Sequence, residues 1–308
     1  MPASSATRLD SRESAFFQRE CEYIKTRTYD AKPPLLKGLS LVPQASGIPL
    51  GTSEITYRSY TEAGRAKLIA NYAKDFPRVD VYGEEYTVKV KDLGASYGYN
   101  IKEIRQGALT GKRLDQRRAT AARNSIERDL NEYTLRSNKE AGTFGILDFP
   151  GLTETTLPAD GEGGSKNWAS KDVDKIIRDI NIMLASVIEP SKGVETPDTL
   201  LLPLNVYSAL QSRRLGDTDS SLIKYVTENF PMLKRIDWLN ELNAIGAGGT
   251  GRVMVGCFDE LHCENQIVNH FEQGDVQQEG MEWEIPCMAS TAGVIVYYPG
   301  AFAFADGV

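Results

Sequence analysis

The sequence predicts an α+β fold, on the strength of a long one-sided helix, a β-rich stretch and a segment of α/β character. The helix is predicted over residues 114–137, where one narrow apolar stripe is surrounded by charged side chains. The β-rich stretch covers residues 54–96, where apolar and polar residues alternate. Helix and strand patterns alternate over residues 170–258, and the C-terminal part returns to β structure. Together these patterns place the chain in the α+β class.

The first fifty residues predict an arm. Ser11 is a plausible N-cap for a helix that runs to about residue 28 and carries Phe16, Phe17 and Tyr23 among its apolar side chains. Four prolines then interrupt residues 31–51, which is typical of an extended segment lying on another surface. We therefore expect this arm to need a neighbour.

Residues 54–96 predict a long hairpin or excursion. Tyr57 and its apolar neighbours alternate with polar residues, a turn signal follows at residues 61–64, and the alternation returns at residues 86–91. A two-stranded ribbon is only marginally stable alone in water. We expect this ribbon to pack against a partner.

The next helices are predicted from apolar spacing. A short helix follows Asn100 and is interrupted at Gly111, and the long helix 114–137 comes next. Its apolar stripe consists of Ala119, Ala122, Ile126, Leu130 and Tyr133. Acidic residues are interleaved with its arginines, which indicates a mixed-charge face rather than a nucleic-acid patch.

The α/β segment is predicted to begin with a helix from Ser170 that ends before Pro190. The expected elements after it are a strand at 199–204, helices at 205–212 and 222–229, a strand at 252–258, and C-terminal strands at 282–285 and 293–298.

Composition narrows the function classes. The 308-residue chain has a net charge of −7, which argues against a protein whose main task is to grip phosphate backbones. Its longest apolar stretches, 200–204 and 293–298, are far shorter than the roughly 18 residues of a membrane span, so no membrane partner is predicted. Residues 1–12 lack an export pattern and the four cysteines lack a disulfide spacing, so we expect a cytoplasmic, reducing compartment.

Two patterns invite an enzymatic interpretation. Gly246, Gly248 and Gly251 satisfy G-x-G-x-x-G, but a strand rather than a helix is expected after them, which favours a connecting loop. Four zinc-type ligands lie close together in the sequence, but their spacing is wrong for a zinc knuckle: Cys257, His262, Cys263 and His270. Neither histidine has a nucleophile motif beside it. We predict no enzyme, no catalytic residue, no cofactor and no metal.

Several short stretches, in order along nearly the whole chain, resemble the major capsid proteins of tailed bacteriophages, whose Hong Kong 97-type shell fold is shared by encapsulin nanocompartments. These stretches are EITYRSY at 54–60 with Gly64, DFPRVDV at 75–81, SYGY at 96–99, residues 114–122, GILDFP at 145–150, PDTLLLP at 197–203, residues 293–299 and ADG at 305–307.

The resemblance implies a domain organisation and a function. The domains would be an N-terminal arm at 1–50, an extended β loop at 51–87, a peripheral domain at 88–195 with the spine helix 114–137, an axial α/β domain at 196–260 and a C-terminal return to the peripheral domain at 261–308. The chain would then be a structural subunit of an icosahedral phage head, assembled in the host cytoplasm and found in the virion. It would self-assemble into pentamers and hexamers that enclose double-stranded DNA without sequence-specific binding.

The same resemblance suggests contacts and partners. The candidate subunit contacts are Phe16, Phe17, Tyr23, Tyr57, Tyr60, Arg65, Lys67 and Arg78. Besides copies of itself, the chain could meet scaffold, portal and decoration proteins. An encapsulin-like cellular compartment stays open as an alternative, and a metal- or nucleotide-dependent enzyme is the alternative from another class.

Overall fold

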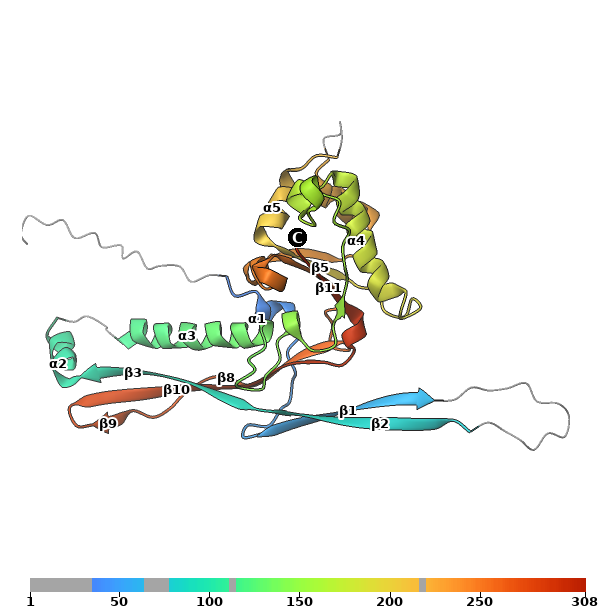
Figure 1. The fold of residues 1–308 in the computed structure, drawn as a ribbon. Helices are drawn as coiled ribbons and strands as arrows, with labels where there is room; N and C mark the ends of the chain where they lie inside the picture. The colour runs from blue at the N-terminus through green and yellow to red at the C-terminus, as the bar shows by residue number, and fades with distance from the viewer. Residues whose placement is uncertain (1–34, 64–77, 111–114, 216–219) are drawn as a thin grey trace, which may run out of the picture. The chain divides into compact units, whose positions relative to one another are not determined.

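The computed structural model describes residues 35–63, 78–110, 115–215 and 220–308 (Figure 1). The helix predicted between Ser11 and residue 28 lies outside the described residues. The described part contains helices and two main β-sheets, which agrees with the predicted α+β class. Among the described helices, none is both long enough and apolar enough to cross a membrane.

The first sheet has the strand order β3-β10-β8, with the short β9 pairing to β10. Its strands are β3 (Lys91–Asn100), β8 (Cys263–Gln273), β9 (Gln277–Glu279) and β10 (Glu282–Val296). All pairings are antiparallel, and β3 runs against β10 from Lys91↔Thr291 to Asn100↔Glu282. Two segments that are far apart in sequence therefore form one sheet.

The long helix α3 (Asp115–Leu135) runs along this sheet (Figure 1). Ala122, Ile126 and Leu130 are buried against Cys287 and Ala289 of β10. The predicted stripe is thus the buried face of α3, although Ala119 and Tyr133 are only half-buried. The short helix α2 (Ile101–Thr110) directly follows β3, as predicted.

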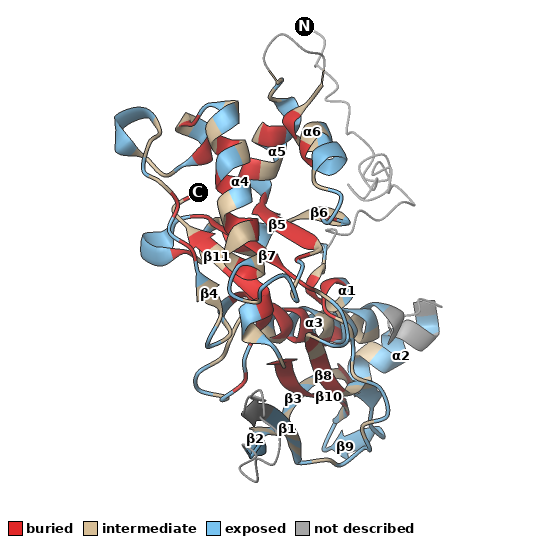
Figure 2. Cartoon of the chain, turned by 90° about the vertical axis from the view of Figure 1, so that its right-hand side faces the viewer, coloured by how far each residue is buried: buried red, intermediate tan, exposed pale blue. Residues whose placement is uncertain are grey.

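The second sheet has five strands in the order β4-β11-β7-β5-β6. Their bounds are β4 (Thr153–Glu154), β5 (Thr199–Pro203), β6 (Arg235–Leu239), β7 (Arg252–Gly256) and β11 (Phe302–Asp306). Every residue of β5 and β7 is buried, and Figure 2 shows both strands in the buried colour. A strand buried on both faces has apolar side chains at successive positions, as in residues 200–202.

The two faces of this sheet pack into different cores. Leu200 and Leu202 of β5 lie in the core covered by helices α4 (Val173–Ile188), α5 (Leu204–Ser212) and α6 (Leu222–Asn229). Leu201 points the other way, because successive side chains of a strand alternate between faces, and joins the core around Leu135 and Phe302. That second core is shared with the end of α3.

Residues 36–45 pack on the body of the chain, where a short helix replaces part of the predicted extended segment. This helix, α1 (Gly38–Leu41), presses against α3: the Gly38 amide donates to Asn131 Oδ1 at 2.8 Å, and an added Cβ at Gly38 would lie 2.8 Å from the same oxygen. Leu41 and Val42 are buried beside Leu135. The expectation of an entirely extended segment is therefore wrong here, because this close fit to α3 is not visible in the local sequence.

Other element boundaries needed correction. The helix expected from Ser170 is α4, which begins at Val173 after a 3₁₀ turn at Trp168–Ser170, and the two C-terminal strands are one strand, β10. Two residues interrupt the apolar pattern of β10 and explain why the sequence predicted two strands. Pro286 lies between the stretches paired to β9 and to β8, and Gly293, with φ of 79°, lies at a register shift. The remaining 3₁₀ helices are Ile146–Asp148, Glu162–Gly164, Asn240–Asn243, Ala247–Gly249 and Pro299–Ala301.

A separate two-stranded ribbon consists of β1 (Glu54–Ala63) and β2 (Asp80–Lys89). The strands pair in antiparallel register from Glu54↔Lys89 to Ala63↔Asp80 (Figure 1). The turn expected at residues 61–64 begins too early, since β1 continues to Ala63. Residues 64–77, between the strands, are outside the described part.

Candidate assembly surface

The β1–β2 ribbon exposes large apolar side chains on both of its faces. Tyr60, Val81 and Tyr82 are 65%, 60% and 63% exposed. Directly opposed residues of an antiparallel pair share a face, so the pairs Tyr60↔Gly83 and Tyr57↔Tyr86 assign Tyr60 and Val81 to one face and Tyr82 and Tyr86 to the other. Because contiguous exposed apolar surface marks interaction sites, the ribbon is the strongest candidate for contact with another chain.

The ribbon is anchored near its base by tyrosines. The Tyr57 ring stacks on Tyr86 at a centroid distance of 5.3 Å and meets Tyr297, which follows β10, edge-on at 5.6 Å. Burial raises the pKa of Tyr57 above its ordinary value. A groove of about 390 Å³ lies beside these rings and is also lined by Phe144 and Phe149. The base of the ribbon therefore belongs to the subunit's own packing, in contrast to its far end.

The predicted contact residues divide into three groups. Tyr60 and Arg78 are exposed, Tyr60 on β1 and Arg78 just before β2. Tyr57 is half-buried and contacts tyrosines of its own chain, so any contact of Tyr57 with a second subunit stays a prediction. The others lie outside the described residues: Phe16, Phe17, Tyr23, Arg65 and Lys67. The structure thus brings Tyr57 and Tyr60 onto one ribbon, and sequence alternation missed exposed Val81 and Tyr82 of the facing strand.

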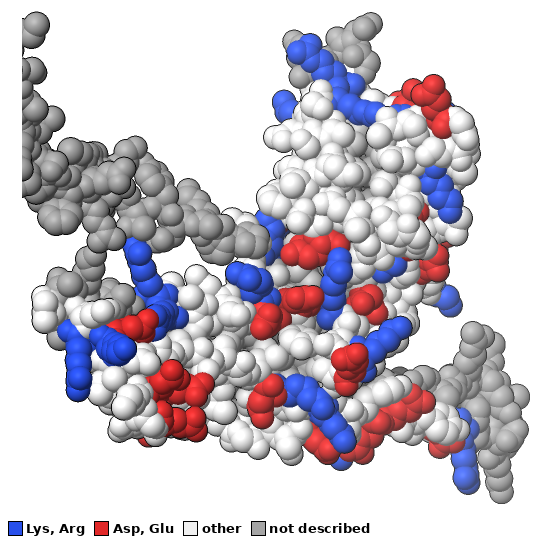
Figure 3. Space-filling view, turned by 60° about the vertical axis from the view of Figure 1, so that its left-hand side comes forward, with Lys and Arg blue, Asp and Glu red and all other residues white. Residues whose placement is uncertain are grey.

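On the face seen in Figure 3, Lys and Arg side chains lie next to Asp and Glu side chains. On α3, Arg123 pairs with Glu127 at 2.7 Å across one helical turn. Arg118 pairs with Glu103 of α2 at 2.9 Å and stacks over the Tyr99 ring. These contacts agree with the predicted mixed-charge face, since two of its arginines are neutralised by carboxylates of the same chain.

The glycine loop at 246–251 has a structural role. Residues Ala247–Gly249 form a 3₁₀ turn with Gly248 and Gly249 in the left-handed region, and the strand β7 follows at Arg252. The Ala247 amide donates to Asp306 at 2.9 Å, which ties the loop to the C-terminal strand. A dinucleotide loop needs a helix after its glycines, so the expectation of a connecting loop is confirmed.

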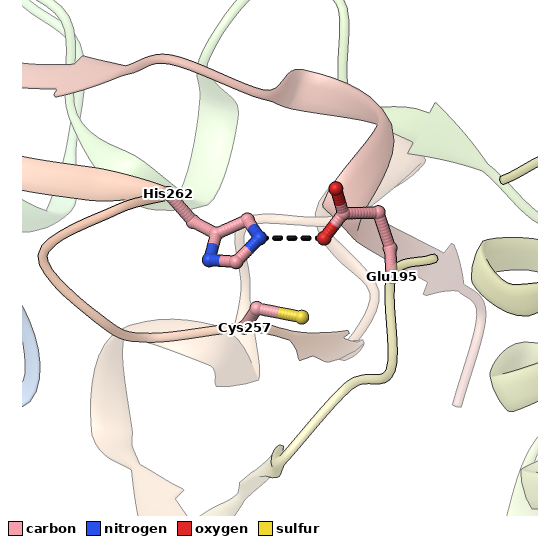
Figure 4. Close-up of side chains that lie close together, drawn as sticks. All are labelled: Glu195, Cys257 and His262. Atoms are coloured by element: carbon pink, nitrogen blue, oxygen red, sulfur yellow. Dashed lines mark hydrogen bonds and ion pairs between the residues drawn. The ribbon is translucent and has the colours of Figure 1, made fainter. Parts of the chain in front are cut away.

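The four zinc-type ligands, for which the sequence predicts no metal site, come together only in part. Cys257 and His262 lie close to each other, and Glu195 joins them from the loop before β5 (Figure 4). His270 is exposed on β8, seven residues beyond Cys263, which corresponds to about 23 Å along a strand. No sequence signal pointed to Glu195, because it is 62 residues from Cys257 and has no motif of its own.

The cluster around His262 is unsuited to nucleophilic catalysis. Burial, together with the nearby carboxylates of Glu195, Asp198 and Asp259, raises the pKa of Cys257 to about 12. A catalytic cysteine needs the opposite environment, in which positive charge stabilises the thiolate. The arrangement therefore gives no support to a Cys-His enzyme.

Comparisons with known proteins indicate a structural protein. The model of the family "Major capsid protein" matches residues 64–308. Among curated protein sequences, none matches the chain significantly. The capsid of Myoviridae phage XM1 is similar in structure, with a TM-score of 0.81 and 16% identity over 95% of this chain and 98% of that one.

Two further solved structures share the fold at low identity. The capsid of a native GTA particle has a TM-score of 0.65 at 9% identity and covers 97% of this chain and 99% of its own. A virus-like particle from Pyrococcus furiosus has a TM-score of 0.55 at 15% identity, with 87% and 91% covered. The mixed α+β fold is thus that of phage capsid structures.

Fold and family together define a structural, shell-forming class rather than an enzyme. The family model covers well over half of the sequence, and the chain belongs to the major capsid protein family. As a member of that family it is a major capsid protein, a structural component of a capsid. The predicted family and the prediction of a non-enzymatic protein are therefore confirmed.

Proposed function

We propose that this chain is the subunit of an icosahedral head of a tailed phage, that it assembles into pentamers and hexamers, and that the shell encloses double-stranded DNA. The observation that carries the proposal is the β1–β2 ribbon, whose exposed aromatic and aliphatic side chains on both faces are not covered by the described part of the subunit. The net charge of −7 fits a shell that encloses nucleic acid without gripping it.

The proposed organisation assigns each part of the chain a place in the shell. The extended loop at 51–87 is the ribbon, and α3 is the spine of the peripheral domain at 88–195 and 261–308, where β3 pairs with β10. The axial domain at 196–260 holds the buried strands β5 and β7 and the glycine loop, and its sheet and core also include α4, β4 and β11, which lie outside the proposed bounds. In a ring of subunits, each subunit uses two different surfaces to contact its two neighbours. Many such contacts, together with the arms at 1–50 that would link one ring to the next, combine to give a stable shell even where each contact is weak.

The ribbon can be tested by placing charge on both of its faces. In the double variant Val81→Asp/Tyr82→Asp, we expect a folded subunit that forms no closed particles, because each carboxylate would be desolvated against a neighbour. Electron micrographs measure assembly and circular dichroism measures folding. The conservative variant Val81→Ile/Tyr82→Phe is the matched control and should assemble normally. Particles of ordinary diameter from the aspartate variant would remove the ribbon from the interface.

A cellular compartment of the encapsulin type is the second candidate, favoured by the similarity to the Pyrococcus furiosus virus-like particle. The two candidates differ in their contents. From the native source, we expect particles that hold nuclease-protected double-stranded DNA, together with portal, scaffold or decoration proteins encoded nearby. Particles that enclose a cargo enzyme and no genome would favour the compartment instead.

A further inference from the structure

Three separate segments bring metal-binding side chains to one point. Glu195 lies in the loop between α4 and β5, Cys257 directly follows β7, and His262 directly precedes β8. Their donor atoms all lie within 4.8 Å of one another, and Figure 4 shows the side chains pointing toward a common centre. The cluster therefore spans the connection between the two main sheets.

The environment has the features of a metal site. Cys257 is 4% exposed, and the side chains of His262 and Glu195 are 14% and 19% exposed. His262 Nε2 lies 2.5 Å from Glu195 Oε2, while its other ring nitrogen contacts the Asp259 carboxylate. A carboxylate on the far nitrogen of a metal-binding histidine fixes the tautomer and the ring orientation. Asp259 has the right place for this role.

We propose that Glu195, Cys257 and His262 form a zinc site in which Asp259 orients the imidazole of His262. Thiolate and imidazole ligands favour Zn²⁺ over Ca²⁺ or Mg²⁺, which prefer oxygen ligands. Ligand distances of about 2.0 Å to nitrogen and oxygen and about 2.3 Å to sulfur set a tetrahedral N···O edge near 3.3 Å. The His262–Glu195 pair therefore opens by about 0.8 Å around the ion. A water molecule or the second Glu195 oxygen completes the coordination.

The charges of the cluster suit a divalent cation. Three carboxyl groups lie around the buried Cys257 thiol: those of Glu195, Asp198 and Asp259. In the structure the Cys257 thiol donates to the carbonyl oxygen of Thr196, with 3.1 Å between Sγ and the oxygen. Zinc binding releases this thiol proton. The ion then joins the loop before β5 to the β7–β8 turn and stabilises the connection between the sheets. This role is independent of whether the shell holds DNA.

The site is tested on the full-length chain after chelator treatment, by titration with Zn²⁺ alone against a competing indicator. We expect one zinc ion per chain and a rise in the unfolding temperature on binding. The variants Cys257→Ser and His262→Gln should each weaken binding by at least about 100-fold, and Asp259→Asn by about 10–100-fold, as for outer-shell partners.

Matched controls use the same residue types outside the cluster. Cys287→Ser replaces a buried thiol of the first sheet, and His270→Gln replaces an exposed imidazole, and both should bind zinc like the native chain. Cobalt(II) gives a readout that needs no variant, since a thiolate ligand produces a sulfur-to-cobalt charge-transfer band. Zinc binding by the native chain no tighter than by Cys257→Ser, or cobalt binding without that band, would overturn the proposal. Equal losses in the control variants would do the same.

Discussion

The five-stranded sheet and the β1–β2 ribbon both contain large apolar side chains, but the sheet buries them and the ribbon exposes them. In β5 and β7 every residue is buried, and both faces are covered by elements of the same chain. In β2, nine of the ten residues are exposed, including Val81, Tyr82 and Tyr86. Burial of apolar area drives both folding and association, so the sheet is stabilised within the subunit, and we propose that the exposed part of the ribbon is covered on assembly.

The largest expected effect of a single change is in the core of the sheet. Phe302 is fully buried in β11 and packs edge-on against Phe258 at 5.2 Å. We expect Phe302→Ala to lower the free energy of unfolding of the subunit by about 3–5 kcal/mol, because it leaves a cavity. Denaturant unfolding of unassembled subunits measures this value. Tyr82→Ala is the partner variant and should leave it almost unchanged. A comparable loss of unfolding free energy in both variants would contradict the claim that the sheet, and not the exposed part of the ribbon, stabilises the subunit.

A smaller effect is expected at the ion pair that holds the C-terminal strand. Arg252 of β7 donates to both Asp306 oxygens, at 2.6 and 2.9 Å, and to the Leu147 carbonyl at 2.8 Å. Its ring-plane contact with Phe304 adds a cation–π interaction at 3.9 Å. Lysine cannot reproduce the two-pronged geometry, so Arg252→Lys should cost about 1.5–3 kcal/mol of unfolding free energy. Arg58→Lys on the ribbon is the control, and an equal cost there would contradict the argument.

Acid should weaken the helical side of the sheet through Asp160. A hydrogen bond from Arg178, at 2.7 Å, lowers the pKa of Asp160 to about 2. A carboxyl with a depressed folded pKa gives stability that is present above its unfolded value near 4 and is lost as the pH falls toward 2. We expect Asp160→Asn to flatten the dependence of unfolding free energy on pH in that window. An unchanged pH dependence in Asp160→Asn, measured by denaturant unfolding between pH 2 and 5, would contradict this role of Asp160.

The parts that the sequence predicted are those with a local signal. Helix α6 begins and ends at the predicted residues, and the buried stripe of α3 matches the predicted one at Ala122, Ile126 and Leu130, because helical spacing is legible within a few turns. Strand β8 was not predicted, since polar residues interrupt its apolar ones and its pairing partner β10 is set by tertiary contacts. Periodicity alone cannot report such pairing.

The ribbon and the His262 cluster both depend on contacts between residues far apart in the sequence, which local patterns do not predict. Alternation around Tyr57 predicted a ribbon, yet which part of it packs on the subunit depends on Tyr297, more than two hundred residues away. Glu195 meets His262 only because α4, β5 and β7 bring their ends together. Such contacts are set by the tertiary structure. A short motif such as C-x₄-H can therefore identify Cys257 and His262 but not Glu195.

The smallest expected effect is at an exposed ion pair between the two strands of the ribbon. Arg58 and Glu85 lie opposite each other on β1 and β2, with their charged groups 3.9 Å apart and more than half exposed. An exposed ion pair of this kind contributes at most about 1 kcal/mol, so Arg58→Ala should change the unfolding free energy of the isolated subunit by less than that. In an assembled shell the same side chain would be covered, and the variant should lower the dissociation temperature of particles by more than it lowers that of subunits. Measuring both temperatures in one buffer decides the matter, with Arg105→Ala on the exposed face of α2 as the surface control. Equal small shifts in subunits and particles would mean that this stretch of the ribbon stays exposed to water after assembly.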